Sequence, residues 1–310
     1  MEQQKGVKSN QEKCKKGYLY NYEDGLIGMS DVAVFLFEFF DKIFENMALE
    51  NDAEKKIFPT LLPVEDYQKT GYLKLSPQYA MFCSDIKQDV KSLEKLDEKI
   101  INEEINELLC ASKYALSPAA CLHVYIQHKN TVFLNPKIFT FCQNVFRNEG
   151  EEQYSQIGRL RDYHVREIVF IGSHEFVLNK RKVFLEKTEG ILKEIGLSYV
   201  SKIANDPFIL PQLEKYKKIQ IIEKSKIEIQ LNIDSQNRIS GSSYNLHGTA
   251  FSYPFDISVR GVAVTETGCV GFGIERWVIA FLKQFGDCPN NWPSYVYDKW
   301  KKVRCRKEWS

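Results

Sequence analysis

Hydrophobic residues recur every three or four positions in three stretches of the chain. The first, residues 31–47, has a thick aromatic face. The second, residues 85–110, mixes Val, Leu and Ile with alternating Lys, Glu and Asp, and the third covers residues 175–197. This spacing gathers the apolar side chains of each stretch on one face of a helix. We therefore predict three amphipathic helices, of which the second is long and has a solvated face.

Alternating or continuous hydrophobic runs predict a series of strands, of which residues 117–125 are the first. An aromatic run over 139–146 and a run over 163–172 are joined by a polar loop, which predicts an antiparallel pair. Further strands are expected over residues 226–233, 239–247 and 255–264. Few strands alternate singly with helices, so the pattern predicts an α+β domain built on a largely antiparallel sheet.

Composition and charge narrow the class of protein. The chain has 310 residues, 44% hydrophobic and 27% charged, which suffices for one sizeable core. Its formal net charge is +1, so no overall basic field favours nucleic acid. The lysine-rich start lacks the apolar core of a secretory signal, and no apolar run reaches the roughly 18 residues of a membrane helix. We expect a cytoplasmic protein outside the membrane, with a flexible segment over residues 1–20 and a single domain over 21–310.

The eight cysteines are scattered and include no Cys-x-x-Cys pair. In a cytoplasmic chain this predicts reduced thiols in place of a disulfide framework. Any metal site must therefore gather its ligands from distant segments.

Residues 267–277 predict a buried strand, a glycine turn and the start of a helix. Gly271 and Gly273 let the backbone pass close to a ligand, because they carry no Cβ. Arg276 lies near the N-terminal end of the helix, where its guanidinium and the oriented N–H groups suit a polyphosphate. The same string also fits an ordinary strand-to-helix turn.

Glu167 is an unexpected residue for a buried strand. By the two-residue period it shares a face with Tyr163, Val165 and Val169. A carboxylate in such surroundings needs a partner such as a cation or a metal.

Together these segments resemble the class II aminoacyl-tRNA synthetase catalytic domain. More narrowly they resemble the amino acid:[carrier protein] ligases, homologues of the atypical zinc-dependent seryl-tRNA synthetases. Residues 58–78 are similar to the family's first motif, 146–149 with 163–172 to its second, and 271–276 to its third. The resemblance implies a class II synthetase-like antiparallel sheet flanked by helices, and a homodimer formed through the first motif.

The resemblance also implies that the chain uses ATP and Mg²⁺ to activate an amino acid as its aminoacyl adenylate. Arg147 would bind the α-phosphate and the incoming carboxylate, and Arg276 the γ-phosphate; these two are the expected catalytic residues. Glu149 would accept a hydrogen bond from the adenine amino group, and Tyr163 would stack on the adenine ring. Glu228 would be a ligand of the magnesium.

Cys121, Glu167 and Cys269 fall at the family's three zinc-ligand positions. Two thiolates and one carboxylate leave a fourth tetrahedral position open, as a catalytic zinc requires. By resemblance that position takes the α-amino group of the substrate, with one zinc per subunit. Without the resemblance, we would interpret Cys121 and Cys269 as buried structural thiols. Asn245 and His247 either line the adenylate pocket or are ordinary polar residues of a strand.

The acceptor of the activated amino acid is expected to be the phosphopantetheine thiol of a small carrier protein. No tRNA partner is expected, because little sequence lies outside the motifs and there is no basic excess. A lysine-rich stretch is either a docking surface for the carrier or a solvated helix face; its residues are Lys180, Arg181, Lys182, Lys187 and Lys193.

Two other functions remain open. One is an aminoacyl-tRNA synthetase that acts on tRNA, and the other is a non-catalytic paralogue that senses an amino acid. The presence of Arg147, Glu149 and Arg276 argues against the paralogue, because a retired site does not need two phosphate-binding arginines.

Overall fold

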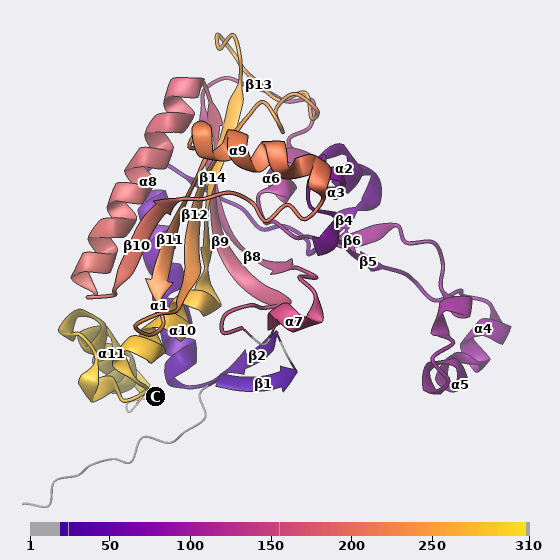
Figure 1. The fold of residues 1–310 in the computed structure, drawn as a ribbon, viewed down its shortest axis with the longest axis horizontal. Coiled ribbons are helices and arrows are strands. Elements are labelled where there is room, and N and C mark those ends of the chain that lie inside the picture. Colours follow the sequence, from indigo (N-terminus) through magenta and orange to yellow (C-terminus); the bar gives the residue numbers. More distant parts are fainter. Residues whose placement is uncertain (1–18, 24, 155, 308–310) are drawn as a thin grey trace, which may run out of the picture.

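A computed structural model describes residues 19–23, 25–154 and 156–307. Its centre is a seven-stranded sheet in the order β10, β11, β12, β14, β9, β8, β3 (Figure 1). Neighbouring strands pair antiparallel except β3 and β8, which are parallel. The strands are Glu54–Lys55 (β3), Lys137–Phe146 (β8), Asp162–Gly172 (β9), Tyr199–Ile203 (β10), Lys226–Asn232 (β11), Arg238–Gly248 (β12) and Glu266–Gly273 (β14). The predicted α+β fold with a largely antiparallel sheet is confirmed, and most of the segment predicted to be flexible lies outside the described residues.

The two faces of the sheet bury different side chains, because successive residues of a strand point to opposite faces. Val270 and Phe272 of β14 belong to a core shared with the long helices, whereas Cys269 belongs to a second core. In β9, Ile168 lies in the first core and Val169 in the second. The second face is the one that carries the candidate site.

Three helices pack on the first face: α1 (Val32–Leu49), α8 (His174–Glu194) and α10 (Ile274–Phe285) (Figure 1). Phe44 of α1 stacks on Phe272 with ring centroids 3.9 Å apart and meets the edge of Trp277 from α10. The aromatic face predicted for residues 31–47 therefore fastens α1 to the sheet. The helices predicted over 31–47 and 175–197 are confirmed.

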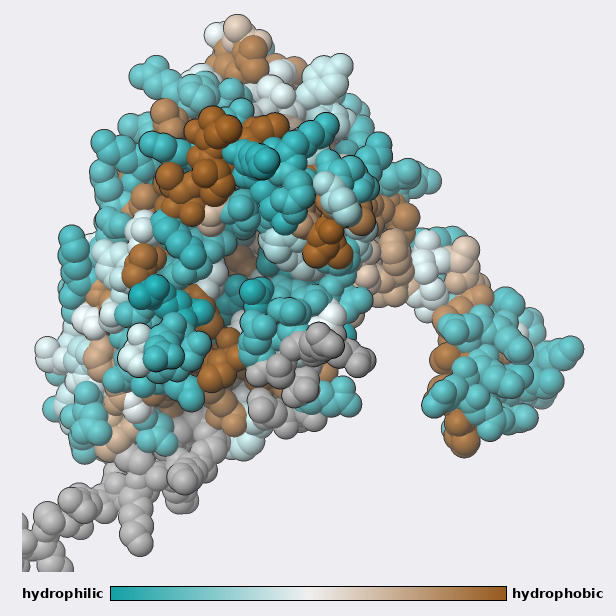
Figure 2. Space-filling view, viewed as in Figure 1, coloured by the Kyte–Doolittle hydropathy of each residue, from teal (hydrophilic) through white to brown (hydrophobic). Residues whose placement is uncertain are grey.

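Residues 85–110 form an arm set apart from the body, as Figures 1 and 2 show. The arm contains α4 (Val90–Glu94), α5 (Leu96–Ile101) and the 3-10 helix η2 (Ile105–Leu108), which pack mainly on one another. Our prediction of one long helix here was wrong. The helix breaks at Lys95 and again after Ile101, where Glu103 takes a φ of 59° that a continuous helix does not allow.

Two predicted strands also differ from the structure. The segment 117–125 enters helix α6 (Leu122–Gln127), since Ala119 and Ala120 favour a helical turn. Of residues 255–264 only Ser258–Val259 (β13) is a strand, because Asp256 and Gly261 have positive φ values of 50° and 76° that interrupt an extended chain.

The remaining elements are short or lie at the edges of the molecule. They are β1 (Leu19–Glu23), β2 (Leu26–Met29), β4 (Leu61–Pro63), α2 (Val64–Lys69), α3 (Tyr72–Leu75), η1 (Pro77–Tyr79), β5 (Met81–Cys83), β6 (Tyr114–Leu116), β7 (Val132–Phe133), α7 (Glu151–Tyr154), η3 (Pro211–Leu213), α9 (Glu214–Ile222), η4 (Pro289–Asn291) and α11 (Ser294–Lys307).

No helix in the described part of the chain is long and apolar enough to cross a membrane.

Candidate active site

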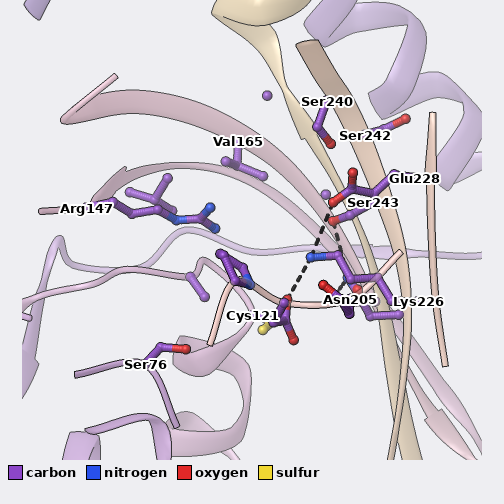
Figure 3. Close-up of a pocket in the computed structure, with 18 of the residues that line it drawn as sticks. Ser76, Cys121, Arg147, Val165, Asn205, Lys226, Glu228, Ser240, Ser242 and Ser243 are labelled. Carbon is purple, nitrogen blue, oxygen red and sulfur yellow. Dashed lines mark hydrogen bonds and ion pairs between the residues drawn. The ribbon is translucent and has the colours of Figure 1, made fainter. Parts of the chain in front are cut away.

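A cavity of about 690 Å³ opens on the second face of the sheet. Its floor comes from β9, β11, β12 and β14, and its walls include residues 70–79, 119–121 and 205–208. In Figure 3 Arg147 and Glu228 reach toward the cavity from opposite sides. All the site residues predicted from the sequence except Glu149 line this cavity: Cys121, Arg147, Tyr163, Glu167, Glu228, Asn245, His247, Cys269 and Arg276.

Arg147 follows directly after β8, and among the described residues its side chain is anchored by a hydrogen bond from one nitrogen. Its Nε donates a hydrogen bond of 2.9 Å to the carbonyl oxygen of Pro118. The guanidinium lies over the rings of Tyr79 and Tyr163, at 5.2 and 5.7 Å from their centroids. Aromatic faces attract a cation without neutralising it. Arg147 therefore keeps its charge available to an anion in the cavity.

Arg276 lies in the first turn of α10 and is only 9% exposed. One Nη donates a hydrogen bond of 3.2 Å to the carbonyl oxygen of Ser240, and the guanidinium lies 4.8 Å from the ring centroid of Tyr163. Its Nε and other Nη are buried without a hydrogen-bond partner among the described residues. Buried donors without partners are costly, so this arginine is suited to a ligand with anionic oxygens.

Glu149 lies beside the cavity and not in its wall. Its Oε2 accepts a hydrogen bond of 2.9 Å from Arg159, which does line the cavity, while its Oε1 is buried without a partner in the described structure. Recognition of adenine by Glu149 stays a prediction.

Glu228 belongs to a charged group that the sequence did not reveal. Lys226 Nζ lies 2.7 Å from a carboxylate oxygen of Asp206 and 3.4 Å from one of Glu228. Burial lowers the pKa of Lys226, but the charges of Asp206 and Glu228 outweigh burial and hold that pKa above its usual value. Only the proximity of the three side chains in space shows that they form one group.

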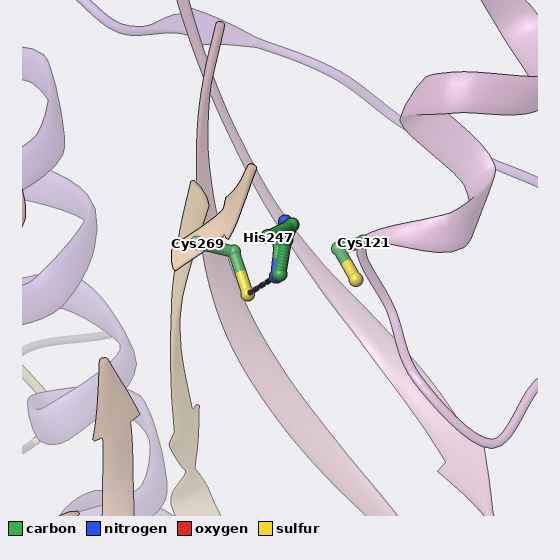
Figure 4. A group of neighbouring side chains, drawn as sticks. All are labelled: Cys121, His247 and Cys269. Atoms are coloured by element: carbon green, nitrogen blue, oxygen red, sulfur yellow. Dashed lines mark hydrogen bonds between the residues drawn. The ribbon is translucent and has the colours of Figure 1, made fainter. Parts of the chain in front are cut away.

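Cys121, His247 and Cys269 form a candidate metal centre (Figure 4). Their ligand atoms lie within 4.8 Å of one another, and Cys269 Sγ is 3.5 Å from His247 Nε2. Cys121 caps α6, His247 lies on β12 and Cys269 on β14, so the site joins distant segments as expected. The sequence left His247 open between the adenylate pocket and an ordinary strand position, and did not place it among the ligands.

Glu167 lies next to this cluster and interacts with Cys269. Burial, followed by Cys269, raises the pKa of the Glu167 carboxyl well above its usual range. A Cβ on Gly271 would lie 2.9 Å from Glu167 Oε2, so glycine leaves room for the carboxylate. Two thiols, an imidazole and a carboxylate are a donor set suited to zinc, and the residues fit that metal.

The pKa values of Cys269 and His247 are shifted by hydrogen bonding and burial. A hydrogen bond with Cys121, followed by burial, raises the pKa of Cys269 well above its usual value. Burial lowers the pKa of His247 to about 4, so its imidazole is neutral at pH 7. A neutral imidazole is a competent ligand, and a bound cation would favour the thiolate forms of the cysteines.

The chain is similar in sequence to several known proteins, although no protein-family model matches it. The chain is 30% identical over 277 residues to the type-2 serine–tRNA ligase of Methanococcus aeolicus, covering 83% of this chain and 53% of that protein. It is 28% identical over 275 residues to the enzyme of that name from Methanocaldococcus jannaschii, with 84% and 53% covered. The chain spans about half the length of the curated relatives it matches.

Solved structures give the fold. The crystal structure of M. kandleri SerRS in complex with A. aeolicus tRNASec matches with a TM-score of 0.80 at 22% identity, over 92% of this chain and 58% of that one. The cytoplasmic serine–tRNA ligase of Naegleria fowleri in complex with AMP matches with a TM-score of 0.64 at 9% identity, over 88% and 53%. The expected class II aminoacyl-tRNA synthetase-like fold is thereby confirmed.

The expectation of a phosphopantetheine carrier protein as acceptor, with tRNA as an unlikely partner, was wrong, and the findings favour the alternative that acts on tRNA. The relatives reported above are named serine–tRNA ligases, and the M. kandleri structure contains a tRNA. The error came from using net charge and the sequence outside the motifs as arguments against tRNA. Net charge averages over the whole surface, whereas nucleic acids bind to local patches. The homodimer and the domain boundaries stay predictions.

Proposed function

We propose that this chain activates an amino acid with ATP, forming an aminoacyl adenylate and pyrophosphate, and transfers the acyl group to a tRNA. One observation carries the proposal: the same cavity gathers two arginines and a set of zinc-type ligands, and one of the arginines is buried with two donors that have no partner among the described residues. The names of the relatives support tRNA as the acceptor and make serine the first amino acid to test.

The two arginines would carry the phosphoryl chemistry. A carboxylate oxygen of the amino acid attacks the α-phosphorus of ATP, and pyrophosphate leaves. This step depends on positioning and on neutralising charge more than on acid–base catalysis. We assign Arg147 to the α-phosphate and the attacking carboxylate, and Arg276 to the γ-phosphate. The two donors of Arg276 that have no hydrogen-bond partner in the described part of the chain support its assignment.

Tyr163 connects these arginines to the base of the nucleotide. Both guanidiniums lie within 6 Å of its ring centroid, at 5.7 and 4.8 Å. We assign this ring to stacking on adenine and Glu149 to its amino group. Glu228 on β11 would be a ligand of the Mg²⁺ that accompanies the phosphates, because carboxylate oxygens suit that ion.

Cys121, Glu167 and Cys269 would bind one zinc, which when bound supplies a Lewis acid for the α-amino group of the substrate. Asn245 contacts one of the cysteines: its side-chain amide donates a hydrogen bond of 3.4 Å to Cys269 Sγ. Such a bond stabilises a thiolate and fixes its direction.

Charging of tRNA tests the proposal. The zinc-loaded chain is incubated with ATP, Mg²⁺, radiolabelled serine and total tRNA, and esterified label is collected by acid precipitation. We expect label on tRNA with the wild type and none with Arg276→Ala. Arg260→Ala, which changes an exposed arginine outside the cavity, should charge normally. Activation of serine without any labelled tRNA would overturn the assignment of the acceptor.

A further inference from the structure

We propose that Glu275 is a positioning residue, whose carboxylate bonds to His164 and thereby fixes two neighbouring side chains that bind ATP. Those neighbours are Tyr163 and Arg276, assigned above to adenine and to the γ-phosphate. The inference rests on the proposed function and adds to it a pair of residues, Glu275 and His164, that does not line the cavity.

The carboxylate of Glu275 takes the place of a strand at one end of the sheet. β14 pairs with β9 as far as Gly273, opposite Val165, and the chain then enters α10. His164 therefore lies one residue beyond the last pair, and its backbone N–H needs another acceptor. Both carboxylate oxygens of Glu275 accept from this N–H, at 3.0 and 2.9 Å. The side chain thus extends the contact between the two strands by one residue.

The imidazole of His164 bonds to the same carboxylate. Its Nδ1 lies 2.7 Å from Glu275 Oε1, and because a carboxylate accepts, this nitrogen carries the proton. Burial lowers the pKa of His164, but the hydrogen bond and the charge of Glu275 outweigh burial and hold that pKa above its usual value. Phe37 of α1 packs edge-on against the imidazole, with ring centroids 5.0 Å apart. One carboxylate therefore holds both the main chain and the ring of a single residue.

The surroundings of Glu275 suit a fixed anion. Its side chain is only 8% exposed, against 41% for that of His164. A buried carboxylate is stable only where donors satisfy it, and His164 supplies two of them. Glu275 also lies in the first turn of α10, where the oriented N–H groups favour negative charge. The contact joins the start of α10 firmly to the start of β9.

This junction determines where two ATP-binding groups lie. Tyr163 precedes the residue that Glu275 holds, and its ring lies 4.8 Å from the guanidinium of Arg276. In the described structure one nitrogen of that guanidinium has a hydrogen-bond partner, the carbonyl oxygen of Ser240. The position of Arg276 therefore depends on the start of its helix. If α10 and β9 separate there, the γ-phosphate and the adenine ring no longer meet their partners together, and displacements of about 1 Å are enough to weaken such contacts.

Binding of ATP and of AMP to the full chain tests the inference without relying on activity. Calorimetry gives both Kd values at saturating Mg²⁺ and without an amino acid. AMP lacks the γ-phosphate assigned to Arg276, so it serves as the reference ligand. In Glu275→Ala we expect the Kd for ATP to rise at least about tenfold and the Kd for AMP less than about threefold. A role confined to stability would lower the fraction of folded chain and leave both Kd values unchanged.

Two further variants divide the contact into its parts. Glu275→Gln keeps an oxygen that can accept the N–H of His164, so its Kd for ATP should lie within about threefold of the wild type. His164→Ala removes the bond from the ring and keeps the backbone N–H. We expect its Kd for ATP to rise about threefold and its Kd for AMP to stay unchanged. Because this side chain is half-exposed, His164→Ala decides the question if Glu275→Ala does not fold.

Asp41→Asn is the matched control. Asp41 of α1 also places a carboxylate on β9, where it accepts two hydrogen bonds from Arg166, but neither residue lines the cavity. This variant should lose stability in urea titrations and keep the wild-type Kd for ATP.

An unchanged preference for ATP over AMP in Glu275→Ala, or in His164→Ala if that variant alone folds, would overturn the inference and leave the proposed function intact. Equal losses for the two nucleotides, or the same loss in Asp41→Asn, would show a general structural role and would also contradict it. A wild-type chain that binds no ATP would instead remove the nucleotide site of the proposed function itself.

Discussion

Tyr163 is the residue on which the two halves of the candidate ATP site converge. Its ring lies between the strand that leads to Arg147 and the first turn of the helix that carries Arg276, and it faces both guanidiniums. A cation over an aromatic face gains about 0.5–2 kcal/mol, depending on how well the pair is desolvated. The ring thus holds two charges near one another without neutralising either.

Replacing Tyr163 separates the role of the ring from that of the hydroxyl. Tyr163→Phe keeps the ring, so the KM for ATP should stay within about twofold of the wild type. Tyr163→Ala removes the ring, and we expect the KM for ATP to rise at least about tenfold, which corresponds to about 1.4 kcal/mol. Steady-state kinetics of adenylation measure both values. Equal KM values in the two variants would mean that the ring does not contact the nucleotide.

At the scale of elements, β14 is packed tightly between its neighbours. Gly268 has no Cβ, and a Cβ at this position would lie 2.8 Å from the backbone oxygen of Asn245 and against the ring of Phe170. Two neighbouring elements therefore approach the strand at the residue before Cys269. The close packing fixes the position of one of the candidate zinc ligands.

Gly268→Ala should consequently destabilise the fold. We expect the free energy of unfolding to fall by about 1–3 kcal/mol, since an added methyl group forces a well-packed core to shift. Gly190→Ala is the control: this glycine lies inside α8 with open space around it, and alanine there should stabilise by about 0.5–1 kcal/mol. Urea titrations give both values. Equal effects of the two substitutions would refute the packing argument.

Helix α1 is joined to the sheet by a partly buried group of charges. Arg166 of β9 donates hydrogen bonds of 2.7 and 2.6 Å to the carboxylate of Asp41, and lies 3.9 Å from Glu45. Glu45 also contacts Lys42 and Lys55 at 2.5 Å. Burial opposes ionisation of Glu45, but these three cations outweigh it and lower the pKa of Glu45 from 4.5 to about 2.

This lowered pKa predicts how stability depends on pH. Glu45 binds its proton more weakly in the folded state, so its contribution is complete above pH 4.5 and is lost as pH falls toward 2. At pH 7 we expect Glu45→Gln to cost about 1–2 kcal/mol, since both lysines are largely exposed and screened. The cost should shrink between pH 5 and pH 3 in urea titrations. A cost that does not change with pH would contradict the assignment.

At the scale of the whole molecule, the sequence was sufficient to predict an α+β fold with a largely antiparallel sheet. The helix over residues 31–47 and the strand pair over 139–146 and 163–172 follow from one-dimensional periodicity, and both are present. The arm shows where periodicity fails. Its apolar spacing is helical throughout, but the helix is broken at Lys95 and Glu103. Val90 and Ile101 remain 70% and 73% exposed. A pattern of apolar residues does not reveal whether a partner surface exists to bury them.

The candidate site was predictable only in part, for a related reason. The resemblance to a known family pointed to Arg147, Tyr163, Cys121 and Cys269 as candidates. The proximity of His247 to the cysteines could not be predicted, because it depends on a bulge that changes the register of β12 by one residue. The pairing of Lys226 with Asp206 likewise arises from the meeting of a loop and a strand.

Amino-acid-dependent exchange of pyrophosphate into ATP is the most direct test of the central claim that this cavity makes an aminoacyl adenylate. The assay is run with the zinc-loaded chain, the chain stripped of metal by a chelator, and the stripped chain resupplied with zinc. We predict exchange with serine or another small amino acid, loss of exchange on stripping and recovery with zinc. The absence of exchange with every common amino acid in the zinc-loaded chain would contradict the account.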